Sequence, residues 1–236
     1  GAMNVVAFFF SDRIALATMR ARPVSRRDDP QLYDLVQRLA ERANLPMPRV
    51  YMSPAAAPNA FATGRSPRHS AVCVTIGLRR MLDEEELAGV LAHELSHIRH
   101  RDMLIATVAA VVAGAITMLT YMGLFFGGDD DEHGPLVALL LLIVAPIAAG
   151  VIRMAISRSR EFEADRGGAQ IAGTGRGLAR ALQKLDAASR RVPLPVPDAQ
   201  SSLFIVQPLT GRRLAKLFAS HPPMDERIRR LQAMDR

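Results

Sequence analysis

A long stretch without charge restricts what this chain can fold into more than any other feature. Residues 103–126 (MLIATVAAVVAGAITMLTYMGLFF) lack any charged side chain, and a helix of about 20 such residues crosses the hydrocarbon core of a membrane. A second apolar run, residues 136–152, is shorter and contains Pro146. A short acidic loop, residues 127–134, separates the two runs. This pattern predicts a transmembrane helical hairpin. A pair of buried core helices is the alternative, as is a second helix that re-enters the membrane or lies flat on it.

The charges beside these runs predict the orientation of the hairpin. The loop between the runs carries no lysine or arginine, whereas basic residues flank the runs on their outer sides: Arg99, His100, Arg101, Arg153, Arg158 and Arg160. Basic residues near span ends stay in the cytoplasm, so the loop is expected outside and the flanking segments inside. Asp102, at the first junction, is interpreted as a helix-boundary charge among lipid headgroups, with a partnership to a nearby arginine as the alternative.

His93-Glu94-Leu95-Ser96-His97 lies just before the first apolar run. Residues four apart share one face of a helix, so His93 and His97 can present two imidazole nitrogens to one metal ion. Imidazoles suit Zn²⁺, and a catalytic zinc keeps one position for water. Glu94 can then accept a proton from that water. The preceding Asp83 and Glu86 match a capping box, which predicts that the motif lies within a helix.

A later acidic stretch supplies the predicted third ligand. Glu161 and Asp165 are four residues apart and share a helix face, whereas Glu163 points to another side. We assign Glu161 to the metal, and Asp165 to the N–H of a metal-bound histidine, whose tautomer it would fix. Glu163 is the alternative ligand. A solvated acidic face paired with neighbouring arginines is the alternative without a metal.

The segment before the motif predicts one helix and a small sheet. Residues 30–43 have helical periodicity and end at a proline-rich turn. Residues 50–52, 59–63 and 71–76 are predicted to be short strands. An exposed strand edge can pair with the backbone of an extended peptide, although an ordinary half-buried strand is the alternative. The residues expected to bind substrate at this edge are Asn59, Ala60, Phe61 and Ala62.

Two residues near the carboxyl end are further candidates. Residues 178–188 and a segment near Leu214 are predicted to be helices, and a last helix begins near Met224. His221 precedes a proline pair, so a loop holds it, and it could donate a hydrogen bond to the oxyanion of a tetrahedral intermediate. Capping of the next helix is an equally supported role. Arg227 is expected to orient His221 or to bind a substrate carboxylate.

The amino-acid composition indicates which classes of binding partner to expect. The formal net charge is +7, but the basic residues are not interleaved with aromatic ones and tryptophan is absent. No nucleic-acid partner is therefore expected, and the positive charge is assigned to anionic lipid headgroups. The single cysteine, Cys73, lies in an apolar strand-like run and cannot form an internal disulfide. It is predicted to be a small buried hydrophobic residue in a reducing compartment, without a nucleophilic role.

These features, in their order along the chain, resemble the HtpX-type membrane zinc endopeptidases of bacteria. The resemblance rests on the His93–His97 motif, the two apolar runs, residues 161–165 and His221-Pro222-Pro223, with residues 59–62 matching as well. It covers the chain from about Ser11 onward. Because that family has two amino-terminal spans that this sequence lacks, the chain is expected to be truncated there.

The resemblance implies a zincin-like metallopeptidase domain, α+β and mostly helical, with the motif helix beside a small β-sheet and a transmembrane hairpin in between. It implies a zinc metalloendopeptidase of the gluzincin type, with one Zn²⁺ per chain on His93, His97 and Glu161 and with Glu94 catalytic. Expected substrates are misfolded or damaged proteins, including membrane proteins, at the cytoplasmic face of the cell membrane. A relative that processes prenylated carboxyl termini and a membrane scaffold with a structural metal are the alternatives.

The expected organisation has four parts. Residues 1–29 form an amino-terminal segment with the end of a truncated membrane span and a linker. Residues 30–102 and 157–236 form the two parts of the metallopeptidase domain, and residues 103–156 form the transmembrane hairpin between them. Membrane lipids and unfolded protein substrates are the expected partners.

Overall fold

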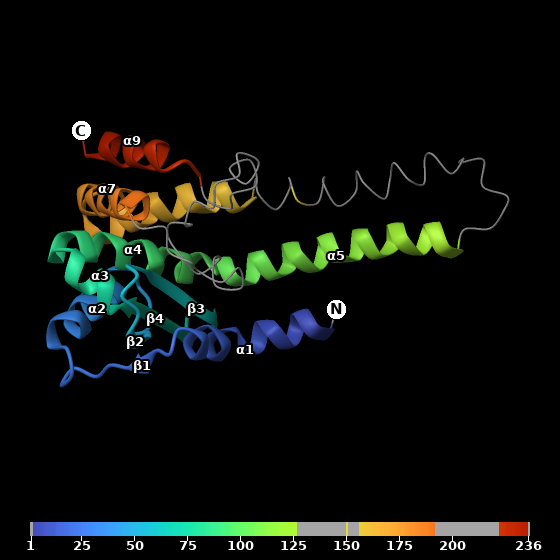
Figure 1. The fold of residues 1–236 in the computed structure, drawn as a ribbon, viewed down its shortest axis with the longest axis horizontal. Helices are drawn as coiled ribbons and strands as arrows, with labels where there is room; N and C mark the ends of the chain where they lie inside the picture. Colours follow the sequence, from blue (N-terminus) through green and yellow to red (C-terminus); the bar gives the residue numbers. More distant parts are fainter. Residues whose placement is uncertain (1, 127–149, 151–155, 192–221, 236) are drawn as a thin grey trace.

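The computed structural model describes residues 2–126, 150, 156–191 and 222–235, which form helices around one small sheet (Figure 1). In chain order the elements are α1 (Ala2–Thr18), β1 (Arg22–Pro23), α2 (Pro30–Arg42), β2 (Arg49–Ser53), β3 (Ala60–Ser66), β4 (His69–Thr75), α3 (Ile76–Met81), α4 (Glu84–His100), α5 (Asp102–Phe126), α7 (Arg176–Arg191) and α9 (Met224–Met234). Residues 156–172 are also helical, and we call them the carboxylate helix because they contain Glu161 and Asp165. The mostly helical α+β class predicted from the sequence agrees with this structure.

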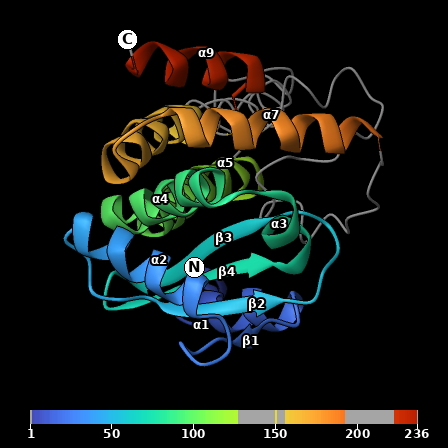
Figure 2. The ribbon, with the colours of Figure 1, turned by 90° about the vertical axis from the view of Figure 1, so that its left-hand side faces the viewer.

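The elements are stacked in layers, with α4 in the middle (Figure 2). On one side α4 contacts β3, and on the other it contacts α7, which in turn contacts α9. The apolar face predicted for α4 is buried, including Leu87, Leu91 and Leu95. Burying both sides of this helix fixes its rotation, so the histidines on its remaining face have a defined direction.

The sheet has the strand order β1-β2-β4-β3, so β3 is an edge strand. The β2–β4 pair is parallel, and the β3–β4 pair is antiparallel, with Ala62 opposite Val72. The three predicted strands are confirmed, but the third ends at Thr75 instead of residue 76. Thr75 accepts a hydrogen bond from the N–H of Leu78 and so begins α3, a short helix that periodicity did not predict.

Both ends of α4 follow local rules. At its start, Asp83 and Glu86 form the predicted capping box, each side chain accepting a hydrogen bond from the backbone N–H of the other. At its end, Arg101 adopts a left-handed conformation with φ 55°. This residue turns the chain between α4 and α5. As a result, Asp102 begins α5 next to the last turn of the motif helix.

The first uncharged run forms α5 as a helix, whereas residues 136–149 and 151–152 of the second run lie outside the described residues. Side chains near the start of α5 are apolar and exposed, including Ile105, Val108 and Val112. Among the residues that the structure describes, no helix is long and apolar enough to cross a membrane. The predicted hairpin therefore stays a prediction.

The amino-terminal segment contributes a second apolar cluster. Ala15, Leu16 and Met19, from α1 and the residue after it, pack with Phe61 and Cys73 of the sheet. Burial raises the pKa of the Cys73 thiol to about 12, so the thiol stays neutral at ordinary pH. The predicted role of Cys73 as a buried hydrophobic residue is confirmed, while the packing of α1 on the sheet was not predicted.

Candidate metal centre and active site

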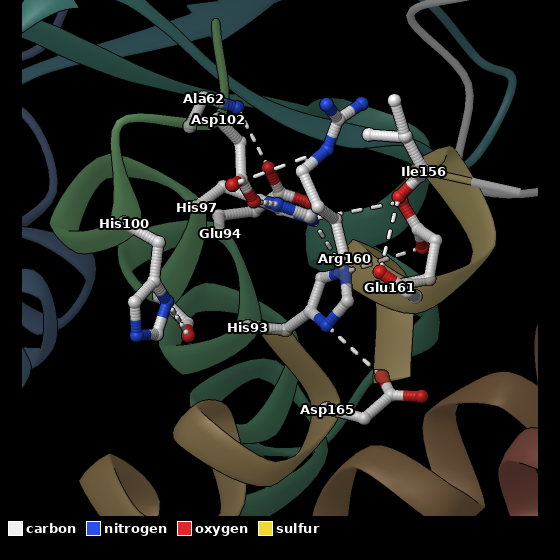
Figure 3. A network of polar contacts seen from close by, with 12 residues as sticks. Ala62, His93, Glu94, His97, His100, Asp102, Ile156, Arg160, Glu161 and Asp165 are labelled. Atoms are coloured by element: carbon white, nitrogen blue, oxygen red, sulfur yellow. Dashed lines mark hydrogen bonds and ion pairs between the residues drawn. The ribbon is translucent and has the colours of Figure 1, made fainter. Parts of the chain in front are cut away.

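Two helices bring three metal-ligating side chains together (Figure 3). The Nε2 atoms of His93 and His97 lie 3.1 Å apart. Oxygens of Glu161, from the carboxylate helix, lie 3.8 Å from Nε2 of His93 and 3.7 Å from Nε2 of His97. One ligand atom from each residue falls within 4.8 Å of the others. Two imidazole nitrogens and one carboxylate oxygen facing a common point are a donor set that fits a divalent metal ion.

Asp165 contacts His93 on the side of the ring opposite to the other ligands. Its Oδ1 lies 3.0 Å from Nδ1 of His93, so the opposite ring nitrogen faces the other two ligands. The guanidinium of Arg227 donates to both oxygens of Asp165, at 2.6 and 2.8 Å. Burial raises the pKa of Asp165, but hydrogen bonds from Arg227 and His93 outweigh this effect and bring it to about 2. The carboxylate is therefore ionised and cannot rotate freely.

Asp102 holds the second histidine in the same way. Its Oδ2 lies 2.6 Å from Nδ1 of His97. Burial lowers the pKa of His97, but the hydrogen bond to Asp102 and the charges of Glu161 and Glu94 outweigh it, so the pKa is raised. Asp102 is itself buried, which differs from the preferred interpretation of a headgroup charge, although Nε of Arg160 does lie 4.0 Å from it. The support of His97 by Asp102 was missed because it depends on the turn at Arg101.

Glu94 lies between the metal site and the edge of the sheet. Its carboxylate accepts a hydrogen bond of 2.8 Å from the backbone N–H of Ala62 in β3. The residue is 6% exposed, so few waters compete for this bond. The candidate general base is thereby fixed beside a strand edge, where a second peptide backbone could pair.

Two glycines of the carboxylate helix, Gly167 and Gly168, allow this helix to pack closely against α4. A Cβ added at Gly168 would lie 2.9 Å from the backbone N and Cα of His93. One added at Gly167 would lie 2.2 Å from the hydroxyl oxygen of Ser96. No side chain fits at these two positions without displacing a neighbour, so the glycines determine how near Glu161 comes to the histidines.

A hollow beside the site connects the strand edge to the start of α5. Its walls include Ala62, Gly64 and Ser66 of the β3 edge, His97 of α4 and Leu104 of α5. An extended chain lying along β3 would follow this surface towards His97. The β3 edge, the candidate base Glu94 and the candidate ligand His97 therefore lie next to one another along this surface.

The remaining candidates occupy different surroundings. Asn59, Ala60 and Phe61 are buried at the start of the β3 edge, and the backbone N–H of Asn59 donates to the Thr75 hydroxyl. Glu163 is exposed and pairs with Arg166 at 3.5 Å, away from the ligands. His221 lies outside the described residues.

Arg227 lies beside the candidate ligands, and its expected roles towards His221 or a substrate carboxylate stay predictions. It is 0% exposed and is held by Asp165, with a further contact of 3.3 Å to Glu161. A side chain in this position cannot reach a substrate carboxylate unless α9 moves. In this position its guanidinium contacts the carboxylates of both Glu161 and Asp165.

Comparison with known proteins identifies the family of this chain. Residues 26–235 match the model of peptidase family M48. A protease HtpX homolog of Pelotomaculum thermopropionicum is 55% identical over 98% of this chain and 85% of its own length. One of Syntrophotalea carbinolica is 52% identical over the same shares, and one of Burkholderia ambifaria is 48% identical over 100% of this chain.

A solved structure has the same fold. The crystal structure of Ste24p from S. mikatae matches with a TM-score of 0.59 and 20% sequence identity over 98% of this chain. The chain spans 56% of the length of that protein. The extent of the family match and the identity to the curated relatives lead to one conclusion: the chain belongs to peptidase family M48, among the HtpX-type metalloendopeptidases.

Proposed function

We propose that the protein is a zinc-dependent endopeptidase that hydrolyses misfolded or damaged proteins, including membrane proteins, at the cytoplasmic face of the cell membrane. One Zn²⁺ per chain would be held by His93, His97 and Glu161. The observation that carries the proposal is the convergence of these three ligand atoms within 4.8 Å, next to the carboxylate of Glu94. Structural zinc sites use four protein ligands and need no base, so the carboxylate of Glu94 beside the three ligands found among the described residues favours catalysis.

The residues of the chain divide the chemistry among them. The bound zinc would supply a Lewis acid that polarises the peptide carbonyl and lowers the pKa of water towards 7. Glu94 would take a proton from the attacking water and return it to the leaving amine. Asp165 and Asp102 would keep Nδ1 of His93 and His97 engaged, leaving both Nε2 atoms for the metal. His221 would donate a hydrogen bond to the oxyanion, a contribution of about 3–4 kcal/mol for one such donor.

The substrate would bind as an added strand along β3. This strand is at the edge of the sheet, and because the N–H of Ala62 is donated to Glu94, a substrate backbone would pair with other groups of the edge. Hydrogen bonds between backbones do not depend on which side chains the substrate carries. Such binding would suit an enzyme that acts on many unfolded sequences. Residues 59–62 would thus align the scissile bond with the metal site.

Membrane attachment would place this chemistry beside lipid. The two uncharged runs of the sequence would form the hairpin, and the exposed Ile105, Val108 and Val112 of α5 would contact acyl chains. Asp102 begins α5 and contacts His97, so the metal site would lie at the membrane surface. The basic residues that flank the runs favour the cytoplasmic side.

The function is tested with the chain purified in neutral detergent and an unfolded casein substrate. Glu94→Gln is expected to keep one zinc per chain while hydrolysis falls by about 10²–10⁴-fold, because the base is lost but no ligand is. Glu163→Gln makes the same chemical change on an exposed residue and should leave both unchanged. Full activity in Glu94→Gln would remove Glu94 from the mechanism.

The orientation is tested by labelling in intact cells. In a Cys73→Ser background, Asp130→Cys should react with a membrane-impermeant thiol reagent from outside, because it lies in the acidic loop. Arg176→Cys, at the exposed start of α7, should react after lysis alone. Outside labelling of Arg176→Cys would contradict the cytoplasmic assignment.

A further inference from the structure

A basic hollow lies between α1 and the turn that joins β3 to β4, apart from the metal site. Its volume is about 670 Å³, which falls within the range of small-molecule sites. Arginines from three elements line it, and all are exposed: Arg13 of α1, Arg49 of β2, and Arg65 and Arg68 of the β3–β4 hairpin. Positive charge from segments far apart in the sequence therefore converges on one space.

Most of this charge is not neutralised within the described part of the protein. Asp12 is the acidic residue among those that line the hollow, and its carboxylate is bound by Arg49 at 2.7 Å. Among the described residues, no carboxylate lies within ion-pair distance of Arg13, Arg65 or Arg68. Guanidinium groups bind phosphate through paired hydrogen bonds, so an anionic phosphate is the ligand chemistry that this arrangement favours.

Apolar side chains border the same hollow. Phe9 and Phe10 of α1 are 51% and 46% exposed and contribute to its wall. The guanidinium of Arg65 lies 5.9 Å from the ring centre of Phe9, and that of Arg13 lies 5.8 Å from Phe10. Aromatic rings beside guanidinium groups are typical of protein surfaces that contact a membrane interface. A ligand at such a surface has both a charged and an apolar part.

The position of the hollow fits such a ligand. The amino-terminal end of α1 and the far end of α5 point away from the sheet in the same direction (Figure 1). Both helices expose apolar side chains near the sheet, including Ile14 on α1 and Met103 on α5. The arginines therefore lie where the apolar surfaces of the two helices meet the folded body.

We propose that this hollow binds the phosphate of an anionic phospholipid headgroup, with Phe9 and Phe10 against the upper part of its acyl chains. The proposal rests on the membrane location proposed above and adds a specific lipid site to it. Arg65 and Arg68 would hold the phosphate, since both are exposed and neither has an ion-pair partner among the described residues. Such binding would fix the β3–β4 hairpin, and with it the substrate edge, relative to the bilayer surface.

The test measures binding of a short-chain lipid to the full chain in neutral detergent by calorimetric titration. Dioctanoyl phosphatidylglycerol is expected to bind saturably, and dioctanoyl phosphatidylcholine, which has no net charge, at least tenfold more weakly. The double substitution Arg65→Gln and Arg68→Gln should weaken phosphatidylglycerol binding by about 30-fold, or about fivefold for each arginine. Both residues are exposed, so the helical content measured by circular dichroism should not change.

The matched control removes the same charge elsewhere. Arg27→Gln and Arg229→Gln together change two exposed arginines outside the hollow and should leave phosphatidylglycerol binding unchanged. Equal weakening in both double variants would overturn the proposal in favour of a diffuse charge effect. Equal binding of inorganic phosphate would overturn the lipid assignment, and equal binding of phosphatidylcholine would remove the role of headgroup charge. Because the assay measures binding, failure of the peptidase mechanism would leave its result intact.

Discussion

Oδ2 of Asp102 lies 2.6 Å from Nδ1 of His97, although Asp102 belongs to α5 and His97 to α4. The left-handed Arg101 between the helices makes this contact possible, because it turns the first residue of α5 back towards the last turn of α4. The helix expected to enter the membrane therefore supports one of the histidines expected to hold the metal. A shift of α5 would change the orientation of that imidazole.

The first prediction concerns this contact. Asp102→Asn should weaken zinc binding by about 10–100-fold, because an amide oxygen is a weaker acceptor for the Nδ1–H of His97. Competition with a chromogenic chelator measures the change. Asp225→Asn, an exposed residue at the start of α9, is the matched control and should bind zinc as the native chain does. Native zinc affinity in Asp102→Asn would show that the hydrogen bond does not orient His97.

The second prediction separates the three acidic residues of the carboxylate helix. Glu161→Gln should weaken zinc binding by more than about 100-fold, since it removes a charged ligand, and Asp165→Asn by about 10–100-fold, since an amide oxygen is a weaker acceptor for His93. Glu163→Gln should have no effect, because that side chain is exposed and pairs with Arg166. Metal content after dialysis measures all three. If Glu163→Gln lost the most zinc, the ligand would have to be reassigned.

The third prediction concerns the buried ion pair of Arg227 and Asp165. Arg227→Met should lower the free energy of unfolding by about 3–5 kcal/mol, because it leaves the ionised Asp165 buried without its cation. Arg229→Met, on the exposed side of the same helix, should change stability little. Urea unfolding of the metal-free chain, followed by circular dichroism, gives both values. Equal effects of the two substitutions would mean that the pair contributes nothing specific.

The fourth prediction concerns helix packing. Gly168→Ala should destabilise the protein by about 1–3 kcal/mol and weaken zinc binding, because the added methyl group would lie 2.9 Å from the backbone of His93. Gly114→Ala, in α5, has no atom of the described residues within 4 Å of the added atom and should be tolerated. Thermal unfolding and zinc titration compare the two. Native zinc affinity in Gly168→Ala would show that the helices can separate without disturbing the ligands.

Local sequence patterns determined much of the site. Residues at a spacing of four share a helix face whatever the fold, so the pairing of His93 with His97, and of Glu161 with Asp165, follows from spacing alone. The capping box at Asp83 depends on groups three residues apart and was predicted for the same reason. An edge position for residues 59–62 was also expected, from their place in a small sheet before the motif, although an ordinary half-buried strand was the alternative.

Other features were decided by tertiary structure. Arg227 contacts Asp165, which lies 62 residues away in the sequence, and α1 packs on the sheet through Ala15 and Leu16. Neither contact follows from the spacing of residues within one helix or strand. The contact of Gly168 with His93 depends on how closely two separate helices approach. The sequence by itself therefore determined which candidate side chains share a helix face, because periodicity acts within one helix. The tertiary structure decided which groups hold those side chains in place, because such contacts form only when separate helices are packed together.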